Sequence, residues 1–166
     1  MPESVPAILV ANRQRRIPLE CNGLRRFARR ALEEVLTLPG TDLPAEIGVV
    51  LVSDRRISEL HRDFMRLSTP TDVITFQHGE IVLSVDTAER QAAEHGTSLD
   101  GELKLYLLHG LLHLRGYDDR TPDARRAMVA VQTRLFARLS GGETAPKPSS
   151  QTRRRRPRRR GRDAAG

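Results

Sequence analysis

Apolar residues along the chain alternate between strand-like and helix-like patterns. Short runs that are rich in β-branched residues and bounded by turn formers predict strands, and they cover residues 7–12, 47–52, 73–76 and 80–84. Longer segments with an apolar residue at every third or fourth position predict helices. They cover residues 19–37, a segment that begins after Ser53 or Asp54 and is broken by residues 66–72, and then residues 86–95, 99–115 and 122–139.

These patterns together predict a single α+β domain, in which a small mixed β-sheet is packed with helices. In the helix after Asp54, we expect Ile57, Leu60 and Phe64 to face the interior, with His61 as a further candidate. The leucine-rich segment 99–115 is predicted to be the central helix of the domain.

Charge is distributed unevenly between two parts of the chain. The formal net charge is +7, and residues 141–166 account for all of it with nine basic and two acidic residues. This segment has almost no apolar side chains, so it cannot bury enough surface to offset the entropy lost on ordering. We therefore predict a neutral folded domain over residues 1–140 and an arginine-rich tail over residues 141–166 that is disordered when unbound.

The tail carries eight arginines in the sequence RRRRPRRRGR (153–162). Guanidinium groups bind the phosphates of nucleic acids without sequence preference, so we expect this segment to contact RNA or the ribosome. The alternative is that the tail aids solubility or binds any polyanion.

Cysteine content and hydropathy exclude several classes of protein. Cys21 is the only cysteine, so neither an intrachain disulfide nor a thiolate-rich metal site can form. No apolar run approaches the roughly 18–20 residues of a transmembrane helix, and the N-terminus lacks the layout of a secretory signal. We expect a soluble cytoplasmic protein without a membrane partner.

The sequence HGLLHLRGYDD (109–119) contains the main candidate for chemistry. His109 and His113 lie four residues apart, on one face of the predicted helix. Gly116 can end that helix in the left-handed conformation, so the chain can turn back and bring Asp118 or Asp119 towards the two imidazoles. Two neutral nitrogens and one carboxylate form a normal ligand set for catalytic zinc. The histidine pair taken alone also fits an exposed surface pair or packed core histidines.

The same spacing fits the metzincin protease pattern HExxHxxGxxH, with Asp119 in the place of the third histidine. The second position is Gly110 instead of the glutamate that acts as general base in peptide hydrolysis. A protease would therefore lack its base, and another reaction would need a base from elsewhere.

The whole segment resembles the HGxLHLxGYDH signature of the YbeY family of bacterial zinc-dependent endoribonucleases. TPTDVITF (69–76) resembles that family's PTDVLSF stretch, GEIVLS (79–84) its GDIxIS strand, and ELKLYLLHG (102–110) its entry to the zinc helix. The blocks share their order and spacing over about residues 47–130. This resemblance implies a zinc ion at the C-terminal end of the central helix, RNA as the substrate and no nucleotide cofactor.

Carried over residue by residue, the resemblance assigns His109 and His113 as the first two zinc ligands. Asp119 falls where the family usually has a third histidine. Because an anionic ligand donates more charge to the ion, we expect bound water to be less acidic there, and activity to be lower or to peak at a higher pH.

A second departure concerns a family arginine upstream of Pro70. The aligned position holds Met65, with Arg66 next to it. Arg66 is the candidate for binding substrate phosphate, since a guanidinium can bind phosphate in a bidentate manner. The alternative is an ordinary solvated arginine near a helix end.

The sequence therefore predicts a single-strand-specific, metal-dependent endoribonuclease. The resemblance implies maturation of the 3′ end of the 16S ribosomal RNA and ribosome quality control, with ribosomal RNA and the small subunit as partners. The alternatives are a zinc-stabilised RNA- or ribosome-binding factor with little catalysis and a minimal metalloprotease. Gly110 and Met65 keep these alternatives open, because each lacks a catalytic group that one mechanism requires.

Overall fold

The structure is a computed structural model that describes residues 4–65 and 71–141, apart from the side chain of Met65. Within these ranges the elements follow the order predicted from the hydrophobic pattern. They are β1 (Ala7–Asn12), α1 (Asn22–Leu36), β2 (Glu46–Val52), α2 (Asp54–Met65), β3 (Val73–Phe76), β4 (Glu80–Ser84), α3 (Val85–His95), α4 (Leu99–Leu114) and α5 (Pro122–Leu139).

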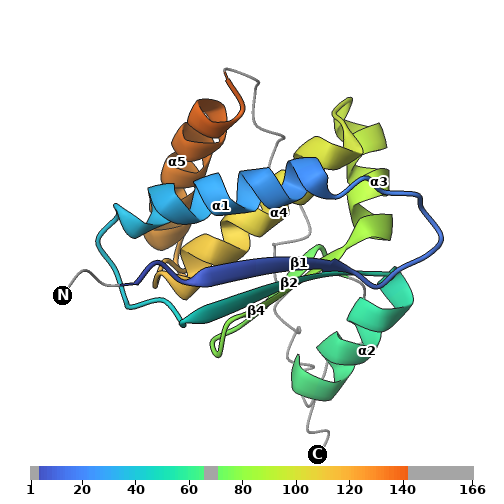
Figure 1. Cartoon of the computed structure of the whole chain (residues 1–166), viewed down its shortest axis with the longest axis horizontal. Coiled ribbons are helices and arrows are strands. Elements are labelled where there is room, and N and C mark those ends of the chain that lie inside the picture. The colour runs from blue at the N-terminus through green and yellow to red at the C-terminus, as the bar shows by residue number, and fades with distance from the viewer. Residues whose placement is uncertain (1–3, 66–70, 142–166) are drawn as a thin grey trace, which may run out of the picture.

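The four strands form one sheet in the order β1-β2-β4-β3, which confirms the predicted small mixed sheet. β1, β2 and β4 run parallel to one another, whereas β3 runs antiparallel to β4 at the edge. Helices α1, α3, α4 and α5 cover one face of the sheet, and α2 packs on part of the other face (Figure 1). The fold is therefore α+β, as the sequence predicts.

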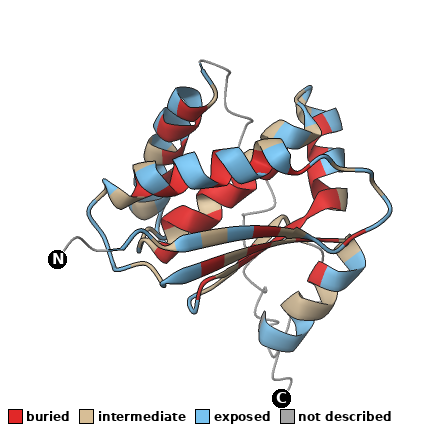
Figure 2. Cartoon of the chain, in the orientation of Figure 1, coloured by how far each residue is buried: buried red, intermediate tan, exposed pale blue. Residues whose placement is uncertain are grey.

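The larger core lies between the sheet and the helices on its first face. α4 crosses this core and is buried on nearly every side, since eight of its apolar side chains are at most 4% exposed. A helix that is hydrophobic all round is expected only in the interior, and Figure 2 shows its buried residues beneath α1. The histidines at the end of α4 are therefore carried on one of the most rigidly packed elements of the domain.

Gly110 allows α4 to approach the sheet closely. A Cβ atom built on Gly110 would lie 2.6 Å from Cγ2 and 3.1 Å from Cδ1 of Ile81 on β4. These distances are too short for van der Waals contact, so a side chain at position 110 would force Ile81 or α4 to shift. The position that lacks a protease general base is thus a packing position.

The second face of the sheet has a much smaller core beneath α2. Ile57 from the helix joins Val52, Ile74 and Val82 from the strands, and Leu60 packs at its margin. The prediction that Phe64 faces the interior is wrong, because its residue surface is 66% exposed. Helix α2 covers only part of this face, and near its end the Phe64 ring meets the Phe76 ring in a T-shaped arrangement, with the two ring centroids 5.1 Å apart.

Candidate metal centre

His109 and His113 lie on one face of the last turns of α4. Their ring centroids are 4.5 Å apart, and the two Nε2 atoms are separated by 2.9 Å. Both residues are half-buried, whereas the leucines between them are completely buried. The i, i+4 spacing thus brings two ring nitrogens together at the edge of the core, as the sequence predicts.

Each imidazole is held by an oxygen acceptor at its other nitrogen. Nδ1 of His109 lies 2.8 Å from Oε1 of Gln132 on α5, and Nδ1 of His113 lies 3.0 Å from the backbone carbonyl oxygen of Tyr117. An oxygen acceptor beside Nδ1 favours the tautomer that has its proton on Nδ1 and a lone pair on Nε2. The two lone pairs then face each other across 2.9 Å, in the position of ligands to one cation.

The end of α4 places the carbonyl group that orients His113. Gly116 has a φ of 105°, its N–H donates to the carbonyl of His113, and the N–H of Tyr117 donates to the carbonyl of Leu112. This pair of bonds is a Schellman motif, which requires a residue in the left-handed region. The same turn directs the Tyr117 carbonyl back at His113, so the helix stop and the ring orientation depend on one glycine.

The loop that follows α1 braces this turn from the other side. The Arg115 guanidinium donates to the carbonyl oxygens of Leu38 at 2.6 and 3.0 Å and of Thr41 at 2.9 Å. In return, the N–H and hydroxyl of Thr41 donate to the carbonyls of Arg115 and Leu114 at 2.8 and 3.0 Å. These bonds satisfy carbonyls that the end of a helix leaves without partners, and they fix the end of α4 to α1.

Asp119 completes the group that the sequence singled out. One ligand atom from each of His109, His113 and Asp119 can be chosen so that all lie within 4.8 Å of one another, and all three residues are half-buried. Two imidazole nitrogens and a carboxylate oxygen are suited to zinc and to related divalent ions. The structure therefore brings the three predicted residues together in an arrangement that could hold one metal ion.

The surroundings keep His113 suited to metal binding. Burial lowers the pKa of its imidazole, and the adjacent His109 lowers it further, whereas the Asp119 carboxylate acts in the opposite direction. The pKa lies below the usual value near 6.5, so the ring is neutral at pH 7. A neutral imidazole is the form that binds a metal.

Gln132 and Arg115 hold the candidate site through hydrogen bonds that the sequence alone did not indicate. Gln132 is 7% exposed and faces inward from α5, four residues after Met128 and three before Leu135. A polar residue at an inward helical position is the signal that could have indicated it, because a buried amide needs a partner. No comparable signal distinguishes Arg115 from the other arginines of the chain.

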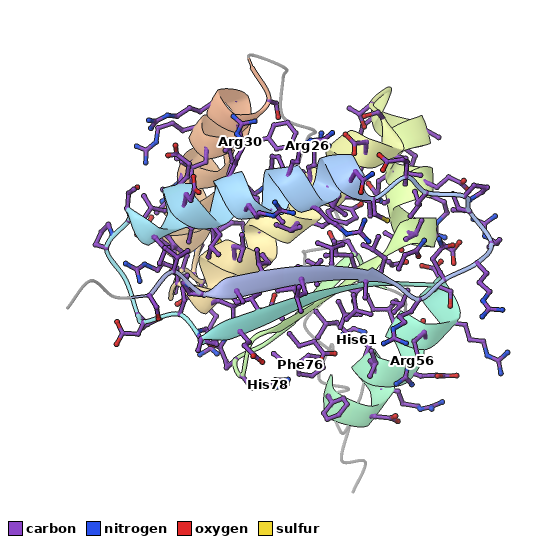
Figure 3. The ribbon with its side chains drawn as sticks, viewed as in Figure 1. Arg26, Arg30, Arg56, His61, Phe76 and His78 are labelled. Carbon is purple, nitrogen blue, oxygen red and sulfur yellow. The ribbon has the colours of Figure 1, made fainter. Side chains whose placement is uncertain are left out.

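The remaining histidines are not part of this group. His95 lies 3.3 Å from the buried Glu102 carboxylate. His78 stacks on Phe76, and both lie with His61 on the α2 side of the sheet, opposite α4 (Figure 3). Arg66 and residues 142–166 of the arginine-rich tail lie outside the described residues. Among the described helices, none is long and apolar enough to cross a membrane.

The chain is similar to known proteins over most of its length. Residues 9–140 match the family described as Endoribonuclease YbeY. The Endoribonuclease YbeY of Pelotomaculum thermopropionicum is 34% identical over 148 residues, which cover 80% of this chain and 97% of that protein. The protein of the same name from Geobacter metallireducens is 36% identical over 147 residues, which cover 80% and 95% of the two chains.

A solved structure has a similar fold. The solution structure of TM1509 from Thermotoga maritima superposes with a TM-score of 0.58 and 26% sequence identity, and the match covers 86% of this chain and 99% of that one. The similarity thus extends over the sheet and helices that position the histidines.

Proposed function

The chain belongs to the endoribonuclease YbeY family, and from this premise we propose that it cleaves RNA with a zinc ion held by His109, His113 and Asp119. The family acts in ribosomal RNA processing. Our proposal for the substrate is single-stranded ribosomal RNA of the small subunit, at the 3′ end of the 16S rRNA. The same proposal includes a contribution to ribosome quality control and a cytoplasmic location.

One observation carries the proposal for a metal ion. The Nε2 atoms of His109 and His113 lie 2.9 Å apart, and both carry lone pairs because Gln132 and the Tyr117 carbonyl hold the Nδ1 protons. Two lone pairs at this distance repel each other unless a cation or a proton lies close to both. The carboxylate of Asp119 within the same 4.8 Å group makes a divalent cation the better occupant.

The proposed ligand residues have different roles at this site. A bound zinc ion supplies Lewis acidity towards a phosphodiester and towards water. His109 and His113 present fixed nitrogen ligands, because their rings are held by Gln132 and by the turn at Gly116. Asp119 supplies one negative charge, which offsets half of the charge of a divalent ion.

Peptide hydrolysis is disfavoured by the surroundings of Gly110. A protease of the related pattern needs a glutamate at this position as general base, and here a Cβ atom alone would lie 2.6 Å from Cγ2 of Ile81. A base at position 110 would therefore require a shift in the packing of α4 on β4.

The test combines metal content with RNA cleavage. We expect mass spectrometry after dialysis to find about one zinc ion per wild-type chain and none in His113→Ala. We also expect the wild type to cleave single-stranded RNA and leave a casein substrate intact, with cleavage reduced at least about 100-fold in His113→Ala, because a ligand to the ion is lost.

A matched control is His78→Ala, since His78 is exposed on the opposite side of the sheet. This variant should retain zinc and cleavage. If the wild type binds zinc and RNA but cleaves no RNA, the protein is instead a zinc-stabilised binding factor. If His113→Ala retains its zinc, the assigned ligand set is wrong.

Two further predictions concern residues outside the described ranges. We propose that Arg66 binds substrate phosphate, and that the arginine-rich segment 141–166 adds non-specific affinity for RNA. Deletion of residues 141–166 should reduce the salt dependence of RNA binding, with the slope of log affinity against log salt falling in magnitude by about 3.

A further inference from the structure

The outer face of α1 concentrates positive charge. Its exposed residues are Asn22, Glu33 and the four arginines at positions 25, 26, 29 and 30. Residues 22–32 of this helix contain no acidic side chain. We call these four residues the α1 arginine stripe. Two of them, Arg26 and Arg30, are labelled in Figure 3, where they lie on the side of α1 away from the sheet.

The arginines of the stripe differ from most others in the described part of the chain. None of the four forms an ion pair with a carboxylate there, and Arg25 donates only to the side-chain oxygen of Asn22 at 3.1 Å. Seven other arginines form ion pairs with aspartate or glutamate, namely Arg16, Arg55, Arg56, Arg62, Arg90, Arg126 and Arg138. The stripe is thus a local excess of charge in a domain whose net charge is zero.

The arrangement of the stripe opposes the stability of the helix. Arg25 and Arg29 are related by i, i+4 spacing, as are Arg26 and Arg30, and like charges at this spacing repel each other. The opposite face of α1 is fully packed in the core through Leu24, Phe27, Ala28, Ala31, Leu32 and Val35. The helix therefore holds the four guanidinium groups close together on a rigid support, and a polyanion would relieve their repulsion.

We infer that the α1 arginine stripe is a binding site for the phosphate backbone of RNA. This inference rests on the proposed function and extends it, because it assigns a substrate-binding surface apart from the metal centre. RNA is the polyanion that an endoribonuclease must hold, and guanidinium groups bind phosphates in a bidentate manner. The loop after α1 also contacts the turn that ends α4, since the carbonyl of Leu38 accepts two hydrogen bonds from Arg115, two residues after His113.

An anionic membrane surface fits the stripe less well than RNA. A helix that lies in a membrane interface inserts an apolar face into the lipid. Every apolar side chain of α1 from Leu24 to Val35 is buried in the protein core, so none is free to insert. The stripe can bind phosphates only through its charge, and this favours a nucleic acid over a membrane surface.

The test measures RNA affinity as a function of salt for the full-length protein. The variant Arg26→Gln/Arg30→Gln removes two charges from the stripe, and the probe is a fluorescent single-stranded 2′-O-methyl RNA whose integrity is checked on a gel. Each lost phosphate contact lowers the magnitude of the slope of log affinity against log salt by about 0.7, so we expect a decrease of about 1.4. The corresponding loss of affinity at 0.1 M salt is roughly 25-fold.

The control is Arg55→Gln/Arg62→Gln on α2, which makes the same change in net charge at exposed positions on the other face of the sheet. This variant should leave the slope unchanged. The melting temperature of the α1 variant should be equal to or above that of the wild type, because the substitutions remove repulsion. A lower slope without a loss of stability would distinguish binding from misfolding.

Three results would overturn the inference: an unchanged slope in the α1 variant, an equal decrease in both variants, or loss of binding to phosphatidylglycerol vesicles with RNA affinity retained. If the wild type cleaves RNA and the α1 variant binds it equally well, the stripe fails and the proposed function stands. If the wild type cleaves no RNA but the slope falls only in the α1 variant, the stripe stands as a binding surface and the catalytic proposal fails.

Discussion

The polar cluster around Asp54 and the histidine cluster at the end of α4 differ in how their hydrogen-bonding groups are satisfied. At the carboxyl end of β4, the Asp54 carboxylate accepts hydrogen bonds from the Ser84 hydroxyl at 2.6 Å, from the Thr87 hydroxyl at 2.8 Å and from the Arg90 guanidinium. Burial raises the pKa of Asp54, but the bonds from Arg90, Ser84 and Thr87 outweigh it and hold the pKa below its usual value. The hydroxyls of Ser84 and Thr87 and the guanidinium of Arg90 each have an acceptor within this cluster.

At the end of α4, the hydrogen-bonding groups of the two histidines do not satisfy one another in this way. The protons of His109 and His113 are directed outwards to Gln132 and Tyr117, and the two inward lone pairs face each other. A cluster that satisfies its own donors and acceptors stabilises the fold, whereas one that leaves lone pairs converging is suited to an external cation. The comparison predicts that changes in the first cluster affect stability and changes in the second affect metal binding.

The largest expected effect is a loss of metal affinity on substitution of Gln132. The variant Gln132→Leu removes the acceptor for the Nδ1 proton of His109 while preserving volume, so the ring loses its fixed orientation. Loss of such a partner typically lowers metal affinity about 10–100-fold. Competition with a zinc chelator of known affinity would measure this change, and an unaltered zinc affinity would contradict the assignment.

A matched change in the first cluster should act on stability. In Asp54→Asn, the amide group turns an N–H donor towards either Arg90 or the hydroxyls of Ser84 and Thr87, which are themselves donors. We expect the free energy of unfolding to fall by about 1–3 kcal/mol with zinc affinity unchanged. Urea denaturation measures this, with the exposed Asp63→Asn as the control, which should change stability by less than about 0.5 kcal/mol.

The pH dependence of stability sharpens the same distinction. The pKa of Asp54 is lower in the folded than in the unfolded chain, so its charge stabilises the fold above the unfolded pKa. This contribution should decline as the pH falls below about 4, near the ordinary aspartate pKa, and should vanish once the pH passes below the folded pKa. The difference in unfolding free energy between wild type and Asp54→Asn should therefore be constant from pH 5 to 7 and shrink in acid; a constant difference down to pH 2 would contradict it.

The smallest expected effect concerns the charge of the ligand set. In Asp119→His the site resembles the usual family pattern with three neutral ligands, and a bound ion would become a stronger Lewis acid. We expect the pH profile of RNA cleavage to move to lower pH by less than about one unit. Coincident profiles of the two proteins, each with one zinc per chain, would show that the carboxylate does not tune the ion.

Most of the fold follows from local patterns, and the two discrepancies have physical causes. The helix predicted from residue 19 begins at Asn22, whose N–H donates to the Glu20 carboxylate at 2.8 Å outside the helix. Phe64 continues the apolar pattern of α2 but is exposed, because that helix covers only part of its face of the sheet. Periodicity indicates which side chains share a face, and it does not indicate how much surface lies opposite that face.

The candidate site likewise has features that local sequence predicts and features that depend on tertiary packing. The approach of His109 and His113 is a property of helical geometry, and the stop at Gly116 is a property of one residue, so both were predictable from the sequence. The partner of His109 lies 23 residues away on α5, and the carbonyls that hold Arg115 lie more than 70 residues away in the loop after α1. Such partners depend on how helices pack, which no local spacing indicates.

The sequence by itself thus determined the order of the elements, the spacing of the two imidazoles and the presence of a nearby carboxylate, because each depends on residues within about ten positions of one another. Only the tertiary structure decided that the lone pairs of those imidazoles converge, that Gly110 is a packing contact with Ile81, and that the α1 arginine stripe forms no ion pair with a carboxylate among the described residues. The physical reason is that tautomers, close contacts and ion pairs are set by groups that folding brings together from distant parts of the chain.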